Sequence, residues 1–315
     1  MADVFSTYDA IGNREDLSNM IYDISPMETP FVSGISKDTA TATNHEWQTD
    51  SLSGAANNAA IEGADAATTI STPTTRLGNY TQISTKTPQV SRTQRQIDSA
   101  GRGDEMDYQV MKMAKELKRD QELILLSNKA KVGGSEILAR QLAGIESWLA
   151  TNWAGSGAAP TGDGTDIRTA GALTAFSEDD LKTTLASCWD NGGNPDIIMA
   201  GSFNKQAMSA FVGGGASGPA QRTVDGDSSR VNTAIDIYVS DFGSLAVVPN
   251  RFMVQESVLV LEMDKFCMSS LASFQETPLA KNGDSDRVQL LSEYTLTSKN
   301  EAASGIIADN TKTTA

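Results

Sequence analysis

The feature that most constrains the fold is a long amphipathic stretch, DEMDYQVMKMAKELKRDQELILLSNK, at residues 104–129. At 1.5 Å per residue, the part from Asp104 to Asn128 predicts a helix about 37 Å long, which is long for a globular domain. Lys118 and Glu122 are spaced for an ion pair one turn apart. A stripe of apolar side chains this wide must be covered by the rest of the chain. The stripe consists of Met106, Val110, Met113, Ala114, Leu117, Leu123, Ile124 and Leu126.

The C-terminal part supplies a surface of suitable length for this stripe. The segments at 266–280 and 286–309 predict long strands, and VQLLSEYTLTS alternates between larger apolar and polar residues. We therefore expect the helix to pack against the strands that contain Leu290, Tyr294 and Leu296.

Residues 41–100 have a different composition. NHEWQTDSL alternates, SGAANNAAIEGADAA is built from small residues, and NYTQISTKTPQVSRTQRQI alternates again. This pattern predicts a long hairpin. Ile83 and Val90 are among its few large apolar residues, and isolated hairpins are marginal in water. We expect the hairpin to lie on another molecule and to contact its own core little, the alternative being a mobile surface flap.

Residues 1–40 contain an apolar segment interrupted by proline, SPMETPFVSGI at 25–35. Proline fixes its own φ and disfavours helix at the residue before it. The sequence therefore predicts an extended segment rather than a helix, and we expect a chain without residues 1–35 to fold but to assemble poorly.

The pattern from residue 176 onward is that of α/β packing. FSEDDLKTTLASCWDNGG predicts a helix with a capping box formed by Ser177 and Asp180, PDIIMAG a buried strand, and SFNKQAMSAF a second helix capped by Ser202. The strand–glycine–helix junction lacks the Gly-Lys-Ser/Thr of a phosphate-binding loop.

The inventory for chemistry is thin. His45 is the single histidine, lies in a strand-like run, and offers too few neighbouring ligands for a metal site. An acid–base pair among the 40 carboxylates stays open, although no spacing indicates one. Cys188 and Cys267 lack a Cys-x-x-Cys pattern, so we expect two reduced, buried thiols. We expect no enzyme activity and no cofactor or metal.

The formal charge of −15 makes direct binding to a phosphate backbone a poor expectation. No stretch approaches the roughly 20 apolar residues of a membrane span, and no basic segment followed by an apolar core indicates a secretory signal.

Several segments together resemble a subfamily of tailed-bacteriophage major capsid proteins of the Hong Kong 97-type fold. They are GNREDLSNMIYDISPMETPFVSGI, EWQTDSL, NYTQI, ELKRDQELILL, GIESWLATN and YTLTSKNEAASGIIAD, which span nearly the whole chain. The resemblance implies an α+β fold. Its regions would be an N-terminal arm (1–40), an extended loop (41–100), a peripheral domain with a spine helix (101–170), an axial domain (171–262) and return strands of the peripheral domain (263–315).

The resemblance also implies a function without turnover: self-assembly through hexamers and pentamers into an icosahedral head that encloses DNA without sequence-specific binding. The protein would assemble in the host cytoplasm and reside in the virion. In this family the arm and the extended loop lie on neighbouring subunits. The expected intersubunit contacts are then Phe31, Val32, Ile35, Gln82, Lys86, Arg92 and Arg95.

Other interpretations remain open at this point. The same fold serves as the shell of encapsulin-type bacterial nanocompartments. The Thr/Ala-rich strands and Arg102-Gly103-Asp104 suggest a surface-layer protein or adhesin, although Asp104 as a helix N-cap accounts better for that tripeptide. Scaffolding, portal and decoration proteins are possible partners. No motif pairs Lys86 with Asn282 for a covalent cross-link, and the sequence leaves proteolytic maturation and the triangulation number open.

Overall fold

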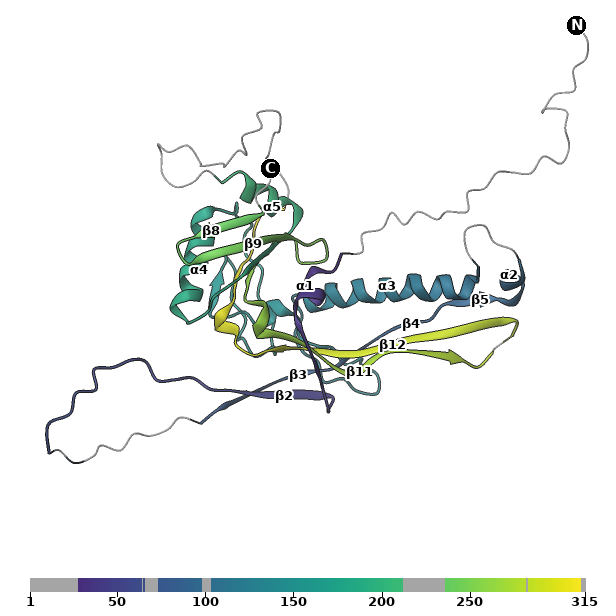
Figure 1. The fold of residues 1–315 in the computed structure, drawn as a ribbon, viewed down its shortest axis with the longest axis horizontal. Coiled ribbons are helices and arrows are strands. Elements are labelled where there is room, and N and C mark those ends of the chain that lie inside the picture. The colour runs from purple at the N-terminus through teal and green to yellow at the C-terminus, as the bar shows by residue number, and fades with distance from the viewer. Residues whose placement is uncertain are drawn as a thin grey trace, which may run out of the picture.

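The computed structural model describes residues 28–63, 65, 73–97, 103–211, 236–281 and 283–312. A long five-stranded sheet lies along one side of the molecule, and a smaller α/β unit stands at one end of it (Figure 1). The two longest strands of the long sheet have 14 residues each and confirm the predicted long strands, except that the second ends at Ser298 instead of continuing to residue 309. The strands of this sheet are β1 (Ser36–Thr39), β4 (Gln82–Lys86), β5 (Gln89–Ser91), β11 (Phe266–Leu279) and β12 (Ser285–Ser298).

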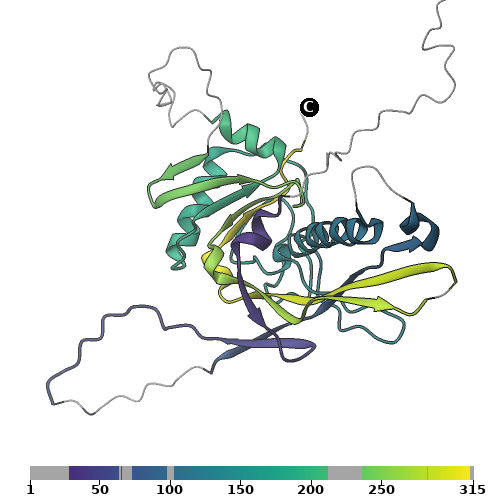
Figure 2. The same ribbon diagram turned by 45° about the vertical axis from the view of Figure 1, so that its right-hand side comes forward.

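The predicted long helix is α3 (Glu105–Leu125), and it lies along the long sheet in both views (Figures 1 and 2). It begins after Asp104, whose side chain accepts a hydrogen bond from the Met106 amide at 2.8 Å. Leu117 is 2% exposed, and Tyr294 is fully buried, which confirms that the stripe packs on β12 and β4. The stripe is narrower than predicted because Leu123 faces solvent and is 53% exposed.

The smaller unit is a six-stranded sheet with two helices on one face, α4 (Glu178–Asp190) and α5 (Ser202–Ser209). The predicted capping box of Ser177 at the start of α4 is confirmed. The predicted cap of α5 is wrong by one residue: Gly201 has extended φ and ψ and is the N-cap. In sheet order the strands are β6 (Asn152–Ala154), β13 (Gly305–Ile307), β10 (Val258–Leu261), β7 (Ile197–Ala200), β9 (Gly243–Pro249) and β8 (Ile237–Ser240).

The other face of this sheet shares a core with the long sheet. Met199 and Leu259 belong to the same buried cluster as Trp148 and Phe266, so the two sheets pack as one body. Short helical turns connect the strands: α2 (Arg92–Gln96), η1 (Ile145–Ser147), η2 (Met263–Lys265) and η3 (Glu301–Ala303). None of the helices in the described part of the chain combines the length and the apolarity that a membrane span requires.

The hairpin consists of β2 (Asn44–Thr49) and β3 (Thr75–Tyr80), and residues 50–63 after β2 project away from the body (Figure 1). It is shorter than predicted. Residues 82–91 leave it and pair with β12 of the same chain. Val90 is accordingly 6% exposed, although Ile83 remains 50% exposed. The prediction of little contact with the core is therefore wrong beyond residue 80, because β12 offers these polar strands a backbone edge.

The described part of the arm starts at Glu28, and residues 1–27 lie outside it. Pro30–Gly34 form a short helix, α1, so the prediction of an extended segment is wrong here. Pro30 occupies the first helical turn, where its missing N–H is not needed and its fixed φ suits a helix.

Candidate functional site

The root of the β2–β3 hairpin is fixed to the body by Asn79, which is fully buried. Its side-chain amide donates to the carbonyl oxygens of Leu296 at 2.8 Å and Ala143 at 3.3 Å. Its side-chain oxygen accepts from the Ala143 amide at 2.9 Å. One side chain thus joins the hairpin to β12 and to the segment before η1.

Aromatic and cationic contacts hold the same root from the other side. The centre of the Trp47 ring on β2 lies 5.3 Å from the centre of the Trp148 ring. The Lys131 ammonium lies 5.7 Å from the centre of the Trp148 ring and donates to the Gly78 carbonyl at 2.7 Å. The direction in which the hairpin leaves the body is therefore fixed by the subunit itself.

Beyond this root the hairpin exposes apolar side chains. Leu52 is 98% and Ile61 is 83% exposed. Exposed apolar residues on a projecting segment are typical of a surface that a partner covers. His45 lies in β2 as predicted, with its ring 6.0 Å from that of Trp47. No group of three potential metal ligands occurs within the described ranges.

The root of the arm, residues 30–35, lies inside the subunit. Phe31, Val32 and Ile35 are 0%, 3% and 4% exposed and belong to the main core cluster. The Phe31 ring lies 6.1 Å from the Phe266 ring. The prediction that these three residues anchor a neighbouring subunit is wrong, because their side chains are already covered by their own chain. For the same reason, a chain without residues 1–35 would lack part of its core.

A buried carboxylate holds the arm root in place. The two oxygens of Glu122 accept hydrogen bonds from the amides of Phe31 and Val32, each at 2.8 Å. Asn250 donates to the same carboxylate at 2.7 Å. Burial raises the pKa of Glu122, and these hydrogen bonds partly oppose the shift. Glu122 therefore joins the arm, the spine helix and the segment after β9.

The i, i+4 spacing of Lys118 and Glu122 predicted an ion pair between them. In the structure Glu122 points inward, and Lys118 donates to the Ser33 hydroxyl at 3.3 Å. A sequence spacing cannot distinguish these two situations, because the i and i+4 positions are the same in both.

The four polar residues expected at the interface have partners in their own subunit. Lys86 lies 3.0 Å from the carboxylate of Asp120 on α3, and its pKa is raised chiefly by that hydrogen bond. The side-chain oxygen of Gln82 accepts from the Leu142 amide at 3.3 Å.

Arg95 joins the N-terminal end of α3 to β12, and Arg92 joins α2 to the turn between β11 and β12. Arg95 contacts Asp104 at 2.6 Å and Asp286 at 2.7 Å, and Arg92 contacts Asp284 at 2.9 Å. The Arg92 side chain remains 70% exposed, against 34% for Arg95 and 32% for Lys86. Of these cations, Arg92 is thus the most open to a second molecule.

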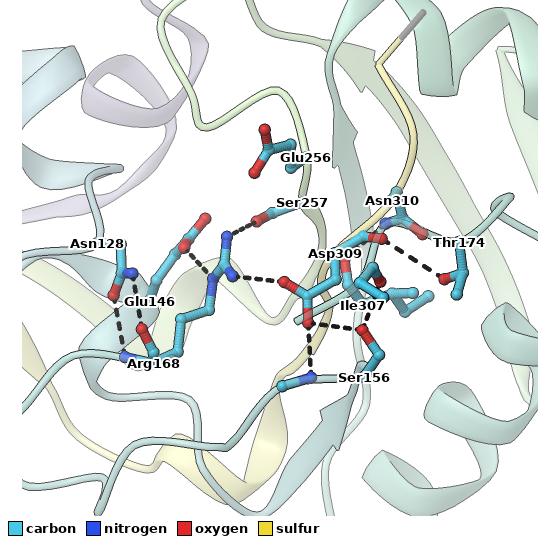
Figure 3. Close-up of polar contacts among 12 residues, drawn as sticks. Asn128, Glu146, Ser156, Arg168, Thr174, Glu256, Ser257, Ile307, Asp309 and Asn310 are labelled. Atoms are coloured by element: carbon cyan, nitrogen blue, oxygen red, sulfur yellow. Dashed lines mark hydrogen bonds and ion pairs between the residues drawn. The ribbon is translucent and has the colours of Figure 1, made fainter. Parts of the chain in front are cut away.

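Arg168 is the centre of a buried ionic cluster, shown in Figure 3. Nothing in the sequence indicated this cluster. Arg168 has a side chain only 3% exposed and donates to Glu146 at 2.6 Å and to Asp309 at 3.0 Å. It also donates to the Ser257 hydroxyl at 3.2 Å. Both carboxylates are fully buried, and Asp309 adopts a positive φ of 60°. The cluster joins η1 to the segments beside β10 and β13.

Both cysteines are buried and free, as predicted. Burial raises the pKa of the Cys188 thiol to about 12 and also raises that of Cys267. Neither thiol is therefore suited to act as a nucleophile at neutral pH.

Comparisons with known proteins agree with this architecture. The family model for the SU10 major capsid protein matches residues 4–311. In sequence, the chain is 28% identical over 347 residues to the major capsid protein of Escherichia phage Phieco32, with 96% of each chain covered.

Solved structures of shells share the fold at low identity. The capsid of a native GTA particle has a TM-score of 0.67 and 11% identity, covering 97% of this chain and 98% of that one. The Cyanophage A-1(L) capsid has a TM-score of 0.64 and 12% identity, with the same coverage. The SrpI encapsulin of Synechococcus elongatus PCC 7942 has a TM-score of 0.55 and 12% identity, covering 96% of this chain and 94% of that one.

The likeness to these structures shows the Hong Kong 97-type fold that the resemblance implied, and the family model covers nearly the whole chain. The chain therefore belongs to the SU10 major capsid protein family, and is the major capsid protein of a tailed bacteriophage.

Proposed function

We propose that this chain assembles through hexamers and pentamers into the icosahedral head that encloses the double-stranded DNA genome of a tailed phage. The observation that carries the proposal is the β2–β3 hairpin. Its root is fixed by Asn79 and by the Trp47–Trp148 contact, while Leu52 and Ile61 beyond it are almost fully exposed. A segment that is held in direction but uncovered at its end fits the surface of a second subunit.

The region boundaries follow from the same argument. We assign the intersubunit role to residues 50–63 rather than to all of 41–100, since Trp47 and Asn79 tie the hairpin root to the subunit's own body and 82–91 belong to its own sheet. The spine helix and the return strands β11 and β12 form the peripheral domain, and the six-stranded sheet, which includes β13, forms most of the axial domain together with α4 and α5. Arg92 is the polar residue that we keep as a contact to another subunit.

The remaining partners are proposed on chemical grounds. A net charge of −15 keeps the inner wall from condensing onto packaged DNA, so the head would hold its genome by enclosure. Assembly in the host cytoplasm would precede packaging. We also propose a scaffolding protein, a portal and decoration proteins as partners, because the resemblance to phage capsid proteins implies them. We assign no catalytic, cofactor or metal site.

Electron microscopy of the purified recombinant protein tests the proposal. We expect closed polyhedral particles in which the hairpin of each subunit lies on a neighbour. A protein that stays monomeric with any available partner proteins would contradict a shell function. Native particles treated with nuclease and then opened should release DNA. Release of a protein cargo instead would favour the encapsulin-type alternative, since the SrpI encapsulin has a similar fold.

A further inference from the structure

The free edge of the six-stranded sheet carries two exposed apolar patches. The first, the aromatic patch, consists of Trp189 at the end of α4 and Phe242 in the β8–β9 turn, with ring centres 5.5 Å apart. Trp189 is 57% and Phe242 is 39% exposed. A shallow hollow beside the two rings is lined by Leu185, Pro195 and Leu245.

The second, the aliphatic patch, consists of Ile237 and Val239 on β8 and Ala246 on β9. Ile237 is 64% and Val239 is 75% exposed, and Ala246 is opposite Ile237 in the strand register. Tyr238, between the two β8 residues, packs against the cluster under α4 and α5. Because side chains alternate along a strand, the aliphatic patch faces away from the helices.

The two patches therefore lie on opposite faces of one edge of the domain. β8 is the last strand in the sheet order, so its outer backbone edge is unpaired by the other described strands. Figure 1 shows β8 and β9 at the outer side of the unit, away from the long sheet. Asp190 and Asp241, the neighbours of the two aromatic residues, are exposed and give the aromatic patch a polar rim, as at protein interfaces.

Two different apolar patches on opposite faces suit a head-to-tail contact between copies of one chain. In such a contact the aromatic patch of each subunit meets the aliphatic patch of the next. Repetition closes a ring when the rotation from one subunit to the next divides a full turn. A two-fold contact would bring like patches together and leave the other type uncovered. We propose that the aromatic patch of one subunit receives the aliphatic patch of the next subunit around the ring of a capsomer. This inference rests on the proposed function and names the surfaces that build the ring.

Charged substitutions on the two patches test the pairing. Trp189→Lys and Val239→Glu each place one charge in an apolar contact, and we expect each to reduce the yield of particles about tenfold or more. In the double variant, every head-to-tail contact brings one lysine to one glutamate. We therefore expect the double variant to regain a large part of the particles lost by the single variants.

The measurement is sedimentation of the assembled fraction, with the melting temperature of each soluble subunit as the check on folding. Both substitutions are at exposed sites, so melting temperatures should match that of the parent. Thr183→Lys is the matched control, because Thr183 is exposed on α4 outside the aromatic patch and should leave assembly unchanged.

The particle yields of these variants either support or overturn the proposed pairing of the two patches. Recovery in the double variant supports the pairing. Single variants that assemble like the parent would overturn it, as would a double variant that shows no recovery, or an equal loss in Thr183→Lys. If the parent, supplied with its partner proteins, forms no particles while remaining folded, the proposed function fails, and this inference fails with it.

Discussion

The arm root is buried in its own subunit, whereas the end of the β2–β3 hairpin is exposed. The sequence predicted that both of them contact a neighbouring subunit. Phe31 in the arm root is fully buried by its own chain, whereas Leu52 beyond the hairpin strands is 98% exposed. Glu122 binds the backbone of the arm root, and Asn79, Trp47 and Lys131 hold the hairpin at its base. An apolar side chain in a projecting segment therefore indicates that another surface covers it. Only the tertiary structure shows whether that surface belongs to the same subunit.

The largest expected effect comes from truncating one apolar residue in each region. Phe31→Ala should lower the free energy of unfolding by about 3–5 kcal/mol, the usual range for a fully buried phenylalanine. Leu52→Ala should leave the subunit as stable as the parent but reduce assembly. Urea unfolding and particle yield measure the two effects. A stable Phe31→Ala subunit would place the arm root outside the core.

The spine helix provides the same contrast within a single element. Leu117 is 2% exposed and Leu123 is 53% exposed, although both belong to the apolar stripe of the sequence. Leu117→Ala should cost about 2–5 kcal/mol of unfolding free energy, and Leu123→Ala should cost well under half of that. Equal costs in thermal unfolding would mean that the helix is rotated from the orientation described here.

The carboxylate at the arm root gives a smaller effect with a distinct pH dependence. Glu122→Gln replaces one acceptor oxygen by an amide donor facing a backbone N–H, so it should cost about 1–3 kcal/mol near neutral pH. Hydrogen exchange should show faster exchange at the amides of Phe31 and Val32 than in the parent. Glu116→Gln on the same helix is the matched control. The Glu116 side chain is half-buried and pairs with Lys86, so this change is expected only to weaken that pair.

The sign of the pH dependence follows from the raised pKa of Glu122. The folded chain binds this proton more tightly than the unfolded chain, whose glutamate pKa is about 4.3. The stabilisation from this group is full below the unfolded pKa and is lost as the pH rises through the folded pKa. As the pH falls from neutral, the parent should therefore gain stability relative to Glu122→Gln. A difference between the two proteins that does not change with pH would contradict this account.

Local signals in the sequence were sufficient for α3, the start of α4 and β12, but not for α1, which was expected to be extended. The period of the apolar residues identified α3, the Ser177–Asp180 spacing identified the start of α4, and alternation identified β12. Each of these signals depends on residues close together in the chain, so no knowledge of the tertiary structure was needed.

The buried polar junctions could not be found in this way. Arg168 and Asp309 are 141 positions apart, and Glu122 and Phe31 are 91 positions apart. A charged residue in a polar stretch looks like surface until the fold brings an opposite charge or a pair of amides to it. The length of the hairpin was overestimated for a related reason. A polar strand can still belong to the subunit's own sheet when another strand offers it a free backbone edge.

The smallest effect on stability is expected at Arg92. Its ion pair with Asp284 joins side chains that are 70% and 62% exposed, so Arg92→Ala should change the unfolding free energy by about 0.5 kcal/mol or less. If Arg92 contacts a neighbouring subunit, particle yield should fall while the melting temperature stays the same. Unchanged yield would remove Arg92 from the interface.

Hydrogen exchange on the free subunit and on assembled particles tests the central claim most directly, because it follows both regions in one experiment. The account predicts that amides of residues 50–63 exchange fast in the free subunit and become protected on assembly. It predicts that the amides of Phe31 and Val32 are already protected in the free subunit and change little. Equal exchange of residues 50–63 in both states, or protection of Phe31 and Val32 only in particles, would contradict it.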